Sequence, residues 1–129
     1  MSKFLISLVM VAASLSVAVA QDQSQDPGNP PSQGVAPKVE NGIGRADVRI
    51  VDEDGNRVKD AYVKLESTRS DGFFCESWDN TNQHGITVLP PIHMGRLKLI
   101  VKAKGFHKQE LEIPAGSLGE PVRVTLKKK

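Results

Sequence analysis

The sequence predicts an all-β fold, a seven-stranded antiparallel β-sandwich of transthyretin-like or immunoglobulin-like type. Apolar and polar side chains alternate with a period of two along several short segments, as on strands that bury one face. Turn dipeptides and prolines separate these segments, and none has the 3.6-residue period of an amphipathic helix. About seven short strands in a chain of this length favour two packed sheets. A small closed barrel is the alternative, because alternation alone does not distinguish the two.

Four segments alternate most clearly and define the expected core. We expect their inward side chains to be buried: Ala46, Val48, Ile50, Ala61, Val63, Leu65, Leu97, Leu99, Val101, Ala103, Val122, Val124 and Leu126. The dipeptides Asp54-Gly55 and Asp71-Gly72 predict turns, since both residue types tolerate positive φ. The second dipeptide lies tightly between two strand candidates and predicts a hairpin.

The first 20 residues have the features of a signal peptide. Lys3 supplies a positive charge, residues 4–19 are mostly apolar, and Ala18-Val19-Ala20 forms a cleavage motif before Gln21. An uncleaved anchor is the alternative, but the apolar run of 16 residues is shorter than the roughly 20 that span a bilayer. We therefore expect an exported protein, in a bacterial periplasm or outside the cell, without stable membrane insertion after cleavage.

Residues 21–42 have the composition of a linker. The segment contains four prolines and four glutamines but only three apolar side chains besides proline, so it cannot bury enough surface to offset the entropy of ordering. We expect a disordered, partly extended linker, and a proline-rich docking ligand is the alternative. Residues 43–129 then form the sandwich domain.

Charge and cysteine content exclude several classes of function. Removing Lys3 with the signal peptide leaves 16 basic against 15 acidic residues, a net charge of +1. This near balance is not typical of a nucleic-acid or polyanion binder. The single cysteine, Cys75, excludes an intramolecular disulfide and a multi-cysteine metal site. We interpret Cys75 as a buried, inert strand residue, and a dimer through a Cys75 disulfide or an apolar outer face is the alternative.

Neither the histidines nor the acidic run predicts a metal site, and no cofactor is expected. His84, His93 and His107 lack the spacing that places ligands together on one element. The alternative is that they converge with Met94 on a soft metal. The run Asp52-Glu53-Asp54 lacks the alternating acids and distant glutamate of a high-affinity calcium loop.

Two blocks of sequence resemble the carboxypeptidase regulatory-like domain. The first block runs from Ile50 to Val63, and the second comprises Thr81 to Gly85, Gly95 to Leu97 and Gly105-Phe106. Arg57 and Asp60 stand where the family usually has proline and glycine. The resemblance covers about residues 45–126 and implies a transthyretin-like sandwich, a fold found in many exported bacterial proteins. Its motifs are structural and imply no activity.

The strand around Trp78 carries the candidate contacts with a ligand or partner. We interpret Trp78 as a residue that closes the core, and the alternative is that it forms a stacking platform for a sugar ring beside polar Glu76 and Asp79. Tyr62 and Ile100 are expected on an outward face, where a contiguous apolar cluster would mark a protein interface.

These features predict a noncatalytic, exported binding or structural module whose partner is a protein or a cell-surface polysaccharide. No catalytic motif occurs, and residues 122–129 lack the terminal Tyr-Arg-Gly-Ser of the related hydroxyisourate hydrolases. A small hydrolase of that kind and a periplasmic metal carrier are the alternatives. Lys127 to Lys129 are interpreted as a solvated tail.

Overall fold

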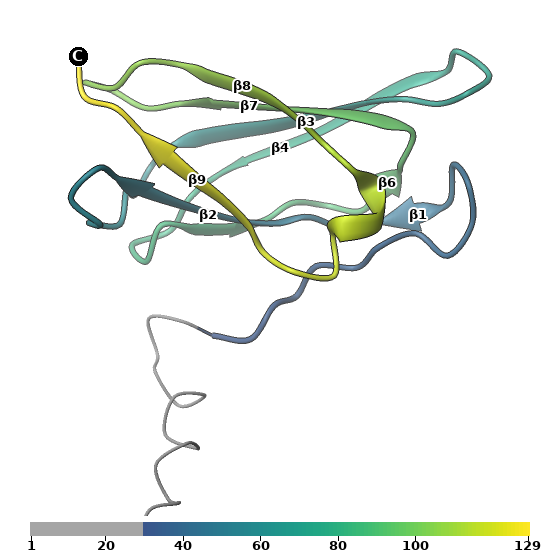
Figure 1. The fold of residues 1–129 in the computed structure, drawn as a ribbon, viewed down its shortest axis with the longest axis horizontal. Helices are drawn as coiled ribbons and strands as arrows, with labels where there is room; N and C mark the ends of the chain where they lie inside the picture. The colour runs from purple at the N-terminus through teal and green to yellow at the C-terminus, as the bar shows by residue number, and fades with distance from the viewer. Residues whose placement is uncertain (1–29) are drawn as a thin grey trace, which may run out of the picture. The chain divides into compact units, whose positions relative to one another are not determined.

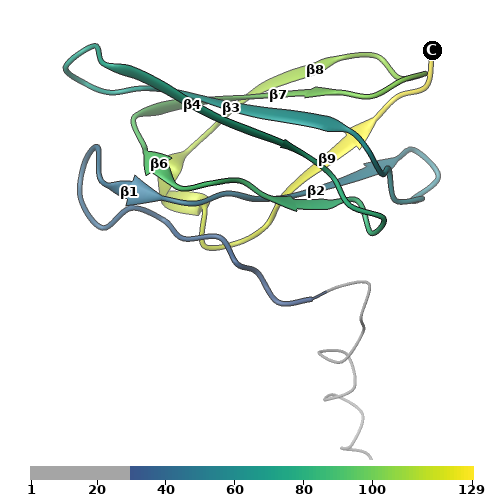
Figure 2. The ribbon, with the colours of Figure 1, turned by 180° about the vertical axis from the view of Figure 1, so that it is seen from behind.

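Two β-sheets lie face to face in this computed structural model, which describes residues 30–129 (Figures 1 and 2). The larger sheet has four antiparallel strands in the order β4-β3-β7-β8. Its strands are β3 (Tyr62–Thr68), β4 (Phe74–Asn80), β7 (Arg96–Lys102) and β8 (Gln109–Ile113). The predicted all-β sandwich is thus confirmed.

The smaller sheet has three strands in the order β5-β2-β9, and a two-stranded ribbon lies at one end. The sheet contains β2 (Asp47–Asp52), β5 (Ile86–Val88) and β9 (Val122–Leu126). The ribbon pairs β1 (Ile43–Gly44) with β6 (Ile92–His93), and a single 3-10 turn, η3 (Ala115–Ser117), follows β8. One pair departs from the predicted antiparallel pattern. After β8 in the larger sheet, the chain crosses to the smaller sheet, where β9 runs parallel to β2.

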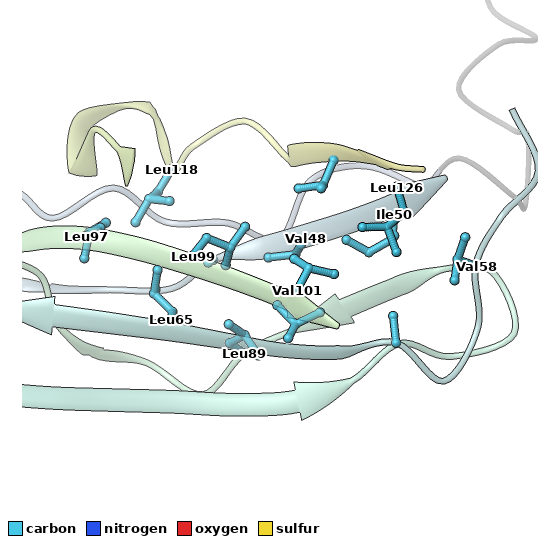
Figure 3. Close-up of a cluster of buried hydrophobic side chains, with 14 of the residues drawn as sticks. Val48, Ile50, Val58, Leu65, Leu89, Leu97, Leu99, Val101, Leu118 and Leu126 are labelled. Carbon is cyan, nitrogen blue, oxygen red and sulfur yellow. The ribbon is translucent and has the colours of Figure 1, made fainter. Parts of the chain in front are cut away.

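The core lies between the two sheets, and Figure 3 shows its side chains pointing into this space. Eleven of the thirteen predicted core residues are buried, whereas Ala103 and Val122 are only partly buried. Alternation did not assign five further buried apolar residues to the core: Val58, Ile86, Leu89, Met94 and Leu118. All except Ile86, which lies on β5, are outside regular strands, where a period of two has no meaning. Within residues 30–129, no helix is long and apolar enough to cross a membrane.

The predicted disordered linker needs correction in its described part. Val35 and Arg45 exchange two backbone hydrogen bonds, of 2.8 and 2.9 Å, and the Gln33 N–H donates to the Asp47 carboxylate at 2.9 Å. Ser32 already belongs to the same compact unit as the sandwich. Backbone pairing needs no apolar side chain, so composition could not reveal it. The rest of the linker, 21–29, and the predicted signal peptide, 1–20, lie outside the described residues.

Candidate binding surface

The solvent-facing side of the four-stranded sheet is the candidate site, and we call it the outer face. Its central residues lie on neighbouring strands and are in register: Tyr62, Lys64, Glu66, Glu76, Trp78, Lys98, Ile100 and Lys102. The inner-facing residues of β3 alternate with these and are fully buried, which fixes the orientation of the strand.

Trp78 is an exposed aromatic side chain on this face. It lies on the edge strand β4 opposite Lys64, and 54% of it is accessible to solvent. Trp78 therefore does not close the core, and the interpretation favoured by the sequence is wrong on this point. Lys64 in turn lies opposite Ile100 on β7, so one row across the sheet contains Trp78, Lys64 and Ile100.

Tyr62 lies in the adjacent row and extends the aromatic surface. It is opposite Asn80 on β4, which makes Trp78 its diagonal neighbour, a spacing of about 7–8 Å between such positions. On the other side of Tyr62, the Lys102 Nζ lies 5.5 Å from the centre of the phenol ring. The structure thus brings Tyr62, Trp78 and Glu76 together on one face.

Asp79 does not share that face. It pairs with inward-facing Val63, and its carboxylate accepts a hydrogen bond from the Asn80 N–H at 2.8 Å. Asp79 is nevertheless exposed, because β4 is an edge strand. The structure therefore places Glu76 on the same side of β4 as Trp78, and Asp79 on the opposite side.

Ion pairs neutralise most charges in the middle of the outer face. The Lys64 Nζ lies 3.3 Å from Glu66 and 4.0 Å from Glu76, and the hydrogen bond with Glu66 is the main reason that the pKa of Lys64 is raised. Glu110 accepts hydrogen bonds from Lys108 and Lys98, each at 3.0 Å, and these lower its pKa, Lys108 first. Such exposed pairs add little stability, but they leave the middle of the outer face with a small local net charge.

Cys75 points to the opposite side of β4 from Trp78. Its Sγ lies 3.4 Å from the His93 carbonyl oxygen, which also accepts a hydrogen bond from the Ser67 hydroxyl at 2.7 Å. The side chain is partly exposed, not buried as predicted, since this end of an edge strand extends beyond the core.

The three histidines lie on separate elements. His84 is in the turn before β5, His93 ends β6, and His107 precedes β8. The His93 Nδ1 lies 2.9 Å from the Asn41 carbonyl oxygen. Among residues 30–129, no group of three His, Cys, Asp or Glu side chains is placed to hold a metal ion.

Sequence patterns did not reveal two hollows at the edges of the sandwich. The larger one, of about 580 Å³, is lined by apolar Val39 and Met94 and by the arginines Arg69 and Arg96. The smaller one, of about 460 Å³, lies where β7 turns into β8 and is lined mainly by basic side chains. Lys102, Lys104 and Lys108 in its lining belong to one short segment, and the fold adds Lys129, which spacing in the sequence does not show.

The carboxylate of Asp52, in the acidic run 52–54, is engaged in hydrogen bonds that stabilise a turn. One of its carboxylate oxygens accepts the backbone N–H groups of Asp54 and Asn56, both at 2.9 Å. The hydrogen bond from the Asn56 N–H is the main reason that the pKa of Asp52 lies below its usual range. The carboxylate therefore stabilises the folded turn when it is ionised.

We expect Asp52→Asn to reduce the acid sensitivity of the fold. Because the folded-state pKa of Asp52 is lower than the unfolded value, its stabilisation is present above about pH 4 and is lost as pH falls through the folded pKa. The check is the drop in melting temperature between about pH 6 and about pH 2.5, which should be smaller in the variant than in the wild type. An identical drop in both proteins would contradict this role of Asp52.

Comparisons with known proteins support the fold and no more. No protein-family model matches the chain, and no curated protein matches it. Among solved structures, it is similar to 3-chlorocatechol 1,2-dioxygenase from Rhodococcus opacus 1CP, with a TM-score of 0.54 and 12% sequence identity over 81% of this chain and 69% of that chain. At this identity the likeness shows shared architecture only. The fold therefore defines this chain as an all-β sandwich protein.

Proposed function

We propose that this protein is a noncatalytic, exported binding module, and that its outer face contacts a cell-surface polysaccharide. The observation that carries the proposal is the exposed Trp78 on a rigid sheet, with Tyr62 as its diagonal neighbour. A large aromatic ring exposed to water loses the benefit of burial, and a planar sugar face or an apolar partner restores it. A protein partner is the alternative occupant of the same face.

The polar surroundings of Trp78 favour a sugar over an apolar protein surface. Lys64 and Glu76 lie beside it and provide hydrogen-bond donors and acceptors at the edge of the ring. Sugars present hydroxyl groups around an apolar ring face, so a ligand of this kind matches both features. The signal-peptide pattern of residues 1–20 and the resemblance to an exported-domain family support an encounter with polysaccharides outside the cytoplasm.

The experiment compares two exposed aromatic residues. Trp78→Ala should weaken retention on immobilised polysaccharides by about 1–3 kcal/mol, or roughly 5- to 150-fold in Kd, because it removes the anchor ring. Phe73→Ala is the matched control, since Phe73 is 57% exposed but lies in the β3–β4 hairpin away from the outer face. Affinity electrophoresis in dextran, polygalacturonate and its methyl ester measures both variants.

The proposal predicts that at least one of these polysaccharides retards the wild type and the Phe73 variant but not the Trp78 variant. Equal losses in the two variants, or no retardation of the wild type by any polysaccharide, would contradict it. If no polysaccharide retarded the wild type and only an added protein fraction did so, the protein partner would be favoured.

A further inference from the structure

Lysine side chains gather at the end of the four-stranded sheet where β7 turns into β8. The hollow of about 460 Å³ at this end is lined by Lys102, Lys104, Lys108 and Lys129, which we call the basic end. Asp60 is the acidic side chain in the same lining, and His107 lies beside the lysines.

The last residues of the sequence are held in place at this end. Phe106 pairs with Lys128 in an antiparallel bridge, the His107 N–H donates to the Lys127 carbonyl at 2.8 Å, and the Lys129 N–H donates to the Gly105 carbonyl at 3.0 Å. Figure 1 shows the end of the chain beside the β7–β8 turn. The interpretation of residues 127–129 as a solvated tail is therefore wrong, because their backbone is paired with the domain.

The charges at the basic end are largely uncompensated. Lys108 pairs with Glu110, but within the described range no ion pair of 4.0 Å or less joins Lys102, Lys104 or Lys129 to a carboxylate. This contrasts with Lys64 and Lys98 on the outer face, both of which are paired. Like charges held close together repel each other, and a ligand that carries negative charge relieves this repulsion.

The basic end is continuous with the aromatic part of the outer face. Lys102 belongs to both, since it lines the hollow and its Nζ lies 5.5 Å from the centre of the Tyr62 ring. A chain of sugars that stacks on Trp78 and Tyr62 therefore extends directly toward Lys104 and Lys129. The formal net charge of +2 over the whole sequence does not show this local excess, because acidic residues elsewhere balance it.

We propose that the ligand of the outer face is an anionic polysaccharide, and that the basic end binds its carboxylate or sulfate groups. This inference rests on the function proposed above and names the class of its ligand. Lysine ammonium groups act as point charges and attract both kinds of anion. The stacking residues Trp78 and Tyr62 distinguish a sugar chain from other polyanions, which the lysines alone would also attract.

The test uses two pairs of polysaccharides that differ in charge but share a backbone. These are polygalacturonate against its methyl ester, and dextran sulfate against dextran, each titrated into the purified protein by calorimetry. The wild type should bind the charged member of one pair at least about tenfold more tightly than the neutral member, and raising NaCl should weaken that binding. The pair that responds identifies the anion as carboxylate or sulfate.

Two double variants of equal charge locate the effect. Lys104→Gln with Lys129→Gln should reduce binding of the charged polysaccharide by about fivefold or more. Lys38→Gln with Arg123→Gln removes the same charge from exposed positions elsewhere and should leave binding unchanged. Circular dichroism of both double variants verifies that they are folded.

Failure of this inference is distinguishable from failure of the proposed function. The inference would be overturned if the charged and neutral polysaccharides of each pair bound equally well in a Trp78-dependent manner, or if the two double variants lost equal affinity. In either case the proposed binding module would stand. If duplex DNA and dextran sulfate bound equally well, and Trp78→Ala changed neither affinity, the inference would be overturned in favour of attraction by charge alone. Absence of binding to all four polysaccharides would overturn both.

Discussion

Replacing Leu99 by Ala is expected to lower the free energy of unfolding by about 2–5 kcal/mol, a large part of the stability of a domain of this size. Leu99 is fully buried at the centre of β7, between Leu65 on β3 and Leu111 on β8. Its truncation removes apolar contact and leaves a cavity that the rigid sheets cannot close. Urea denaturation followed by circular dichroism measures the change.

Lys98→Ala is the matched control for Leu99→Ala. Lys98 is the neighbouring residue on the same strand, and it points outward to an exposed ion pair with Glu110. Its truncation should leave the denaturation midpoint almost unchanged, because exposed pairs contribute little. Similar effects of the two substitutions would mean that the strand is oriented differently from the structure.

Gly95→Ala should destabilise the domain by about 2 kcal/mol or more, because there is no room for a side chain. A Cβ atom at this position would overlap the Thr68 carbonyl oxygen and lie 2.6 Å from the Arg69 Cα. Both neighbours are backbone atoms at the end of β3, so relief requires movement of the strand. The expected result is a lower melting temperature.

Gly116→Ala provides the comparison for Gly95→Ala. A Cβ atom at Gly116 would meet no heavy atom within 4 Å, so this variant should unfold close to the wild type. Equal melting temperatures for the two variants would contradict the close contact between Gly95, just before β7, and the backbone at the end of β3.

The strand residues show how far the sequence can predict this fold. Leu65 belongs to a segment where alternation indicates which side faces solvent, and the structure buries it as expected. Alternation was ambiguous around Trp78, because both faces of that segment begin with phenylalanine, and the structure exposes Trp78. Alternation did not identify Leu118. This residue follows the η3 turn, in the connection between β8 and β9 that crosses from one sheet to the other, and its side chain packs in the core. A local period carries no information about such long-range packing.

The site was predictable only where it depends on a single strand. Glu76 and Trp78 are two residues apart and must share a face, whereas Asp79 is one residue beyond Trp78 and must not. The contact of Lys102 with Tyr62 depends on the register between β3 and β7, which the sequence does not reveal. The basic end depends further on backbone pairing between residues 105–107 and 127–129.

The most direct test of the outer face as the binding surface is an NMR titration, in which the amide chemical shifts of the protein are followed as a polysaccharide that binds it is added. The indole N–H of Trp78 and the backbone amides of Tyr62, Glu76 and Lys102 should show the largest chemical-shift changes, since these residues adjoin one another across β4, β3 and β7. The amides of the three-stranded sheet β5-β2-β9 should change least. Largest changes in that three-stranded sheet, with Trp78 unaffected, would contradict the account.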